Sequence, residues 1–446
     1  MNTNYKELTE NLVEKCLKLG ASEAEVYLQS TRQLSIQVLN HEIETIEEAS
    51  THGVGFRVFV NGSMGFSHCN DFNDSSFEDT IKRAIAFASV TTPDKYNVLP
   101  ADKGITNVGG LYDDEVLGIA MEKKIEMALK LEELALSDSR ITKSSGSGFG
   151  ESESEIFIAN SKGISKSYKS SGCSMGVYVV AEKGEQKSTG GEYSSVRSFS
   201  DLKTLEEIAA KASRDAWEML DPRMINTQRA SVIFDRDVAR SLFGGIIAAM
   251  NGERVIQGAS FLKNSLGKQF ASNKLTIIDD GTREKGMASA PFDGEGVPTQ
   301  KIVLVENGVL KSFMYNTQAA KRAGVESTGH GSRSGFTSLP DIGNHNLYVE
   351  KGEAAVDEII ASTERGLLLK EVTGYGINPV NGNFSGGASG FWIEKGEIIH
   401  PVKGITIAGT ASEILNNIDL IGDDLDLERT FTAPTLRIAE MQIGGA

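Results

Sequence analysis

Alternating apolar residues separated by glycine-containing turns constrain the fold of this chain more than any other feature. Apolar side chains alternate with polar ones over residues 34–38, and again over 54–60 before an Asn61-Gly62 pair. Successive side chains of a strand face opposite sides, and Asn-Gly favours the tight turn of a hairpin. The chain also has 47 glycines but only 9 prolines. We therefore predict an antiparallel meander with many tight turns.

A helix, strands and a helix follow one another twice in the first half of the chain. Apolar residues at helical spacing predict the helices, and alternation predicts strands over 24–67 and 141–199. The helices are expected over residues 8–19, 77–89, 115–136 and 205–220. This order suggests a duplicated helix-meander-helix unit. The sequence similarity between strands of the two units would, however, also be expected of two ordinary hairpins.

Hairpins dominate the second half of the chain, which begins at Asp221-Pro222. Asn307-Gly308 and Lys395-Gly396 each follow an apolar strand and are typical of hairpin turns. We predict an α+β protein with antiparallel sheets and flanking helices. Its domains are expected to be an N-terminal α+β domain over 1–221 and a C-terminal β-rich domain over 222–446.

Charge and composition exclude several classes of protein. The formal net charge is -16, so the summed field repels nucleic acid and anionic lipid. Three widely spaced cysteines fit a reducing compartment. Residues 1–14 lack an apolar signal core, and the longest apolar run, 242–250, is too short to span a bilayer. We expect a cytoplasmic protein without nucleic-acid or membrane partners.

No motif in the sequence defines a catalytic centre. Residues 172–176 match G-x-S-x-G, but a strand is expected after the serine where a nucleophile elbow needs a helix. His330, His345 and His400 fall in predicted loops or strand ends, and no histidine pair has helical spacing. Each is best interpreted as an ordinary core or surface residue. The residues alone therefore predict neither a catalytic group nor a metal site.

The second half nevertheless resembles a known family, TldD/PmbA, whose members were formerly described as modulators of DNA gyrase. The agreement runs in order from about residue 228 to the end of the chain. It rests on these segments: Ile277-Ile278-Asp279-Asp280-Gly281-Thr282, Phe292-Asp293-Gly294-Glu295-Gly296-Val297-Pro298-Thr299, 304–311, Ser327-Thr328-Gly329, 378–385, Gly390-Phe391-Trp392-Ile393-Glu394 and Pro434-Thr435-Leu436-Arg437-Ile438.

This sequence departs from the TldD branch of that family at its zinc site. In that branch, H-E-x-x-x-H on the helix after the domain boundary and a cysteine near the C-terminus bind zinc. The corresponding helix here, 238–250, has neither histidine nor glutamate, and 423–434 has no cysteine. The chain is therefore similar to the TldE (PmbA) branch. The resemblance implies a non-catalytic subunit without a cofactor of its own, paired with a TldD-like zinc peptidase. The two together are expected to cleave unfolded or modified peptides in the cytoplasm.

Two further expectations concern peptides and assembly. We predict that Asn383, Phe384, Ser385, Gly386 and Gly387 help to hold an extended peptide by strand addition, although the segment is equally well a turn needed only for folding. The apolar face of helix 238–250 and the hairpins around Leu304 and Trp392 are candidates for core or for a dimer interface. The alternative function is an independent homodimeric peptide-binding protein, or a hydrolase that uses Ser385, His330 or an unassigned group.

Overall fold

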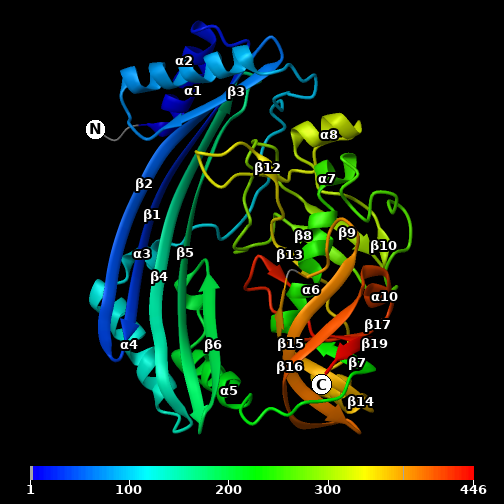
Figure 1. The fold of residues 1–446 in the computed structure, drawn as a ribbon. Coiled ribbons are helices and arrows are strands. Elements are labelled where there is room, and N and C mark those ends of the chain that lie inside the picture. Colours follow the sequence, from blue (N-terminus) through cyan, green and yellow to red (C-terminus); the bar gives the residue numbers. More distant parts are fainter. Residues whose placement is uncertain (1–3, 375, 446) are drawn as a thin grey trace.

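The computed structural model describes residues 4–374 and 376–445. One long, curved sheet with helices behind it forms one side of the molecule, and shorter sheets form the other side (Figure 1). Among the described residues, no helix is long and apolar enough to span a membrane.

The first half of the chain forms a six-stranded antiparallel sheet with the order β3-β2-β1-β4-β5-β6. Its strands are β1 (Glu23–Leu39), β2 (Glu42–Val60), β3 (Ser63–Cys69), β4 (Ile141–Asn160), β5 (Ser165–Lys183) and β6 (Gln186–Val196). The two central strands, β1 and β4, pair from Glu25 opposite Asn160 to Val38 opposite Ser147. The predicted meander is confirmed, including the Asn61-Gly62 turn between β2 and β3.

Helices cover one face of this sheet in two groups. They are α1 (Tyr5–Lys18), α2 (Asp74–Val90), α3 (Asp114–Gly118), α4 (Met121–Leu136) and α5 (Leu205–Trp217), with a 3-10 turn at Phe199–Asp201. The first two cover a core that includes Phe56, and the last two cover a core that includes Phe149. The predicted repeat of helix, meander and helix is therefore confirmed, and each meander has three strands.

One helix prediction in this half was wrong in detail. The continuous helix expected over 115–136 is two helices, because Ile119 and Ala120 adopt extended backbone angles. Asp113 caps α3 by accepting a hydrogen bond from the Glu115 backbone, whereas α4 begins without a side-chain cap.

The second half builds a small barrel and a second sheet. The first sheet has the order β16-β15-β14-β7-β19-β17, and β16 pairs again with β19 so that five strands close on themselves. The second sheet has the order β10-β9-β8-β13-β18, and β11 pairs with β12. The strands are β7 (Gln228–Phe234), β8 (Ile277–Asp280), β9 (Lys301–Glu306), β10 (Val309–Leu310), β11 (Gly331–Ser332), β12 (Asp341–Ile342), β13 (Leu347–Val349), β14 (Arg365–Thr373), β15 (Asn383–Glu394), β16 (Glu397–Thr410), β17 (Ile418–Ile421), β18 (Phe431–Thr432) and β19 (Leu436–Gly444).

Helices accompany these sheets, and the chain enters this half between α5 and β7, where Asp221-Pro222 lies. They are α6 (Arg236–Ala249), α7 (Gly252–Ile256), α8 (Thr317–Ala323), α9 (Val356–Ala361) and α10 (Ala411–Asn416). Leu242, Phe243 and Ile246 of α6 share one core with Leu304 and Trp392. The apolar face of α6 and the side chains of Leu304 and Trp392 are thus core, as one of the two interpretations predicted.

Buried charges join the two halves. Arg57 on β2 donates to Glu25 on β1 at 2.7 Å and lies 3.3 Å from Glu295, which belongs to the second half. Arg333 of the second half forms a second ion pair with Glu25. All four side chains are at most 6% exposed. Because an unpaired charge is costly in the interior, these residues fix the two halves against each other.

Candidate functional site

Two places in the second half carry groups capable of chemistry, and the first is the start of α6. Asp235 caps the helix and accepts a hydrogen bond from Lys370 of β14 at 2.7 Å. Asp237, in the first turn, forms an ion pair with Lys211 of α5 at 2.9 Å. Although burial opposes the charged forms, Asp237 raises the pKa of Lys211, and Lys211 lowers the pKa of Asp237. Lys211 thus favours the ionised form of Asp237, and Lys370 pairs with Asp235.

A cavity of about 450 Å³ opens beside this end of α6, between the two halves of the molecule. Its wall includes charged groups of both signs and two tyrosines, Tyr178 and Tyr193. The charged lining residues are Glu192, Lys211, Asp215, Glu218, Asp235, Asp237, Arg240, Lys370, Glu371, Lys403 and Arg429. No histidine or cysteine of the described chain lines it. The cavity therefore offers polar partners to a ligand but lacks the nitrogen and sulfur ligands that zinc favours.

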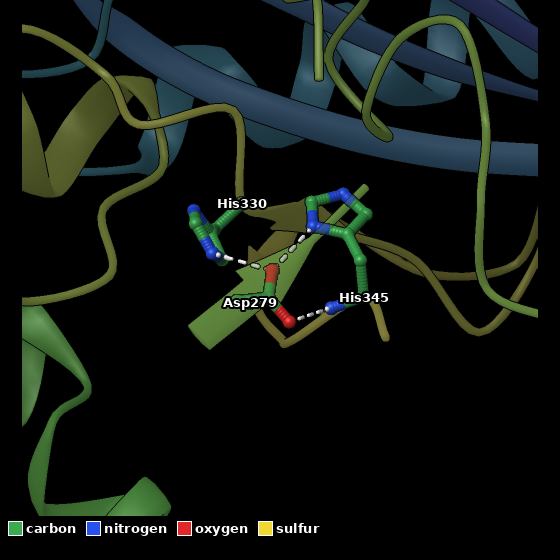
Figure 2. Close-up of side chains that lie close together, drawn as sticks. All are labelled: Asp279, His330 and His345. Carbon is green, nitrogen blue, oxygen red and sulfur yellow. Dashed lines mark hydrogen bonds and ion pairs between the residues drawn. The ribbon is translucent and has the colours of Figure 1, made fainter. Parts of the chain in front are cut away.

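The second place is a buried cluster of Asp279, His330 and His345 (Figure 2). Asp279 lies on β8, His330 immediately precedes β11, and His345 lies two residues before β13. One carboxylate oxygen of Asp279, Oδ2, is 2.9 Å from His345 Nδ1 and 3.0 Å from His330 Nε2. The other, Oδ1, accepts a hydrogen bond from the His345 backbone N–H at 2.9 Å. Asp279 thus joins two loops to one strand.

The surroundings of Asp279 and His345 shift the pKa of both groups. Burial opposes ionisation of Asp279, but the two histidines lower its pKa to about 2. Burial likewise opposes a charge on His345, but Asp279 raises the pKa of that imidazole. His330 Nδ1 lies 2.8 Å from the Thr328 hydroxyl. The cluster is therefore a carboxylate held between two imidazoles.

Nitrogen and oxygen atoms of these three residues lie within 4.8 Å of one another, so the set has the donor types of a metal site. Their side chains are 0%, 0% and 10% exposed, however. A peptidase zinc needs an open position for water and substrate. This closed arrangement suits cross-linking of loops and does not suit peptide cleavage.

A second buried carboxylate lies beside the cluster and makes it sensitive to pH. Asp293 accepts hydrogen bonds from the backbone N–H groups of Glu295, Val297 and Gly331. Burial and the neighbouring Glu295 nevertheless raise the pKa of Asp293 to about 7. Asp293 and His345 both bind a proton more tightly in the folded chain than in the unfolded chain.

We expect the free energy of unfolding to decrease as pH rises from about 4 to about 7, between the unfolded and folded pKa values of Asp293. A group whose pKa is raised by folding contributes its full stability below the unfolded pKa and loses it as pH rises through the folded pKa. Denaturant midpoints between about pH 4 and pH 8 measure this slope, since His345 adds to it only above its ordinary pKa. Asp293→Asn and His345→Asn should each flatten it; the same slope in the parent and in both variants would contradict the assignment.

The structure places the predicted peptide segment at the start of β15, so it is a strand and the turn interpretation was wrong. Asn383 to Gly387 pair with Thr410 to Thr406 of β16. Asn383 and Ser385 are exposed, whereas Phe384 is 3% exposed and packs in the core. A side chain at Gly386 would meet the Thr373 carbonyl at 2.8 Å. The backbone that approaches this glycine therefore belongs to the same chain.

The other sequence candidates are not brought together as a catalytic set. Ser174 of the G-x-S-x-G segment lies within β5, so its interpretation as strand is confirmed. His330 is buried, and no hydrogen bond among the described residues joins Ser385 to a histidine. Sequence reasoning missed the partner of the two histidines, Asp279, which lies 66 residues before His345. Its only signal was its place in a motif of the family resemblance.

Three family models match the chain in succession. They are described as PmbA/TldA metallopeptidase domain 1 (residues 24–88), central domain (114–220) and C-terminal domain (227–445). A relative described as metalloprotease PmbA from Escherichia coli O157:H7 is 30% identical over 99% of this chain and 97% of its own length. The chain belongs to the PmbA/TldD family.

Solved structures of PmbA/TldD-type proteins share the whole fold. A putative modulator of DNA gyrase from Bacteroides thetaiotaomicron has a TM-score of 0.90, with 28% identity and all of both chains covered. TldE from Thermococcus kodakarensis has a TM-score of 0.89 at 25% identity and covers 98% of this chain and 99% of its own. Proteins named as TldD homologues are also related to the chain.

Proposed function

We propose that this chain is the non-catalytic, TldE-like subunit of a cytoplasmic TldD/TldE zinc metallopeptidase that processes or degrades unfolded or modified peptides. The observation that carries the proposal is the start of α6. The family fold extends over the whole chain, yet this helix has no histidine or glutamate. Aspartates at its start are instead neutralised by Lys211 and Lys370.

The packing of α6 supports the same conclusion. Its apolar residues Leu242, Phe243 and Ile246 are fully buried in the core of the second half. Asp237 of its first turn and Arg240 line the cavity between the halves. The helix thus keeps its place in the fold without offering metal ligands, so the zinc of the proposed enzyme belongs to a TldD-like partner.

Co-expression with a TldD-like partner tests the proposal. We expect a stable complex that cleaves unfolded peptides, with no cleavage by either chain alone and poor cleavage of folded proteins. Size-exclusion chromatography and a fluorogenic peptide assay give the two readouts. Full activity of the partner without this chain, or peptide cleavage by this chain as a homodimer, would contradict it.

Within this complex, the start of β15 is proposed to hold an extended peptide. The ladder between β14 and β15 ends where Thr373 pairs with Gly387. Before that point, among the described residues, β15 has a ladder partner only in β16. The exposed side chains of Asn383 and Ser385 lie in this part of the strand. They are the groups of the segment that are free to contact a peptide.

Ser385→Arg should slow peptide processing several-fold without changing the melting temperature, because a long charged side chain would stand where the peptide lies. Gly386→Val is a poorer test, since the new side chain would clash with Thr373. The control is Glu397→Arg, an exposed residue of the adjacent β16. If the Ser385→Arg variant processed peptide at the parental rate, the proposal that this segment contacts the peptide would be contradicted.

A further inference from the structure

The outer edge of β2 is open over most of its length. β3 pairs only with Val54–Val60 of this 19-residue strand. The preceding residues, 42–53, pair with β1 on one side. In Figure 1, this stretch forms the free edge of the long sheet. Backbone N–H and C=O groups that point away from β1 therefore have no strand partner among the described residues.

Both faces of the strand are exposed along this edge as well. Every side chain from Glu42 to His52 is exposed, and the side chains become buried from Val54 onwards. Ile43 and Ile46 are each 45% exposed. Long, exposed edges with apolar side chains tend to pair with other chains unless they are covered. An edge of this kind is better suited to stable binding of a partner subunit than to transient binding of a substrate peptide.

The open edge is held in a fixed position at both ends. At one end it continues into the strand that β3 covers. At the other, the backbone N–H groups of Asn40 and His41 in the β1–β2 turn donate to the carboxylate of Glu132 at 3.2 and 2.6 Å. Glu132 lies on α4, and its side chain is 0% exposed. Because the edge is already ordered, a partner strand would not have to order it on binding.

The charge of the edge determines what can pair with it. Glu42, Glu44, Glu47 and Glu48 lie within seven residues. Glu48 forms an exposed ion pair with Arg32 of β1, whereas the other three form none with the described residues. A second copy that paired the same edge around a two-fold axis would bring glutamates against glutamates, which is unfavourable. The complementary occupant is a strand that carries lysine or arginine.

We propose that residues 42–53 of β2 form an edge-strand docking site for a basic β-strand of the TldD-like partner subunit. This inference rests on the proposed function, because it names the surface by which that partner is bound. Main-chain hydrogen bonds would extend the long sheet into the partner. The basic side chains would pair with Glu42, Glu44 and Glu47, and Ile43 and Ile46 would contact the partner's apolar side chains.

The test compares two triple variants of the full chain that change net charge equally. The first replaces Glu42, Glu44 and Glu47 with lysine, and none of these residues forms an ion pair with a described residue. The control replaces Glu185, Glu353 and Glu364, which are exposed elsewhere, with lysine. We expect the first variant to melt like the parent but to bind the partner at least tenfold more weakly, and the control to bind within twofold of the parent.

Hydrogen exchange supplies a second readout on the parental complex. Amides of residues 42–53 should exchange more slowly once the partner is bound. Equal affinity of both variants, unchanged exchange over 42–53, or intact assembly with slower cleavage of lysine-rich peptides would each overturn the docking site. The proposed function fails separately, if the parent itself forms no complex with the partner.

Discussion

Arg57→Met should lower the free energy of unfolding by about 3–5 kcal/mol, because it leaves the buried Glu295 without its cationic partner and the buried Glu25 with Arg333 alone. Arg57 donates to both carboxylate oxygens of Glu25, at 3.0 and 2.7 Å, and to Glu295 at 3.3 Å. Methionine fills much of the same space but neutralises neither partner. Urea denaturation followed by circular dichroism measures the change.

Arg32→Met is the matched control, since Arg32 lies on the adjacent β1 and pairs with Glu48 at the surface. An exposed pair of this kind contributes about 1 kcal/mol or less. A similar shift for both variants would show that the buried network between the halves is not a major source of stability.

Asp279→Ala should also cost about 3–5 kcal/mol, because it removes the carboxylate that faces two buried imidazoles. It also removes the acceptor of the His345 backbone N–H. The loops that carry His330 and His345 would then be tied to β8 less firmly, and proteolysis should increase in both. Thermal melting and limited proteolysis measure these effects.

Asp341→Ala controls for the loss of an aspartate in the same half, since Asp341 is exposed on β12. Exposed substitutions usually change stability by about 0.5 kcal/mol or less. If Asp279→Ala melted within a degree of this control, the cluster would have no structural role.

Local patterns predicted the strands and most of the turns of this fold. Asn307-Gly308 and Lys395-Gly396 form the turns expected of them, with positive φ at both residues of each. The turn at Asn40-His41 was missed because it contains no glycine. Both residues nevertheless have positive φ, and Glu132, some 90 positions later in the chain, satisfies their N–H groups. A contact with a residue distant in the sequence thus stabilises this turn in place of the glycine that usually marks one.

The buried polar groups were the least predictable part of the molecule. Arg57 and Glu295 are 238 positions apart, and Asp279 and His345 are 66 apart. No periodicity links residues at such separations, so the ion network and the histidine cluster appear only once the chain is folded. The absence of histidine and glutamate from α6, by contrast, can be read directly from the sequence.

Metal analysis of this chain and of its complex with a TldD-like partner is the most direct test of the non-catalytic role. The account predicts no stoichiometric zinc in the chain alone, one zinc per complex, and zinc that stays with the partner when the two are separated. One tightly held zinc in this chain, lost together with peptidase activity when His330 or His345 is replaced, would contradict it.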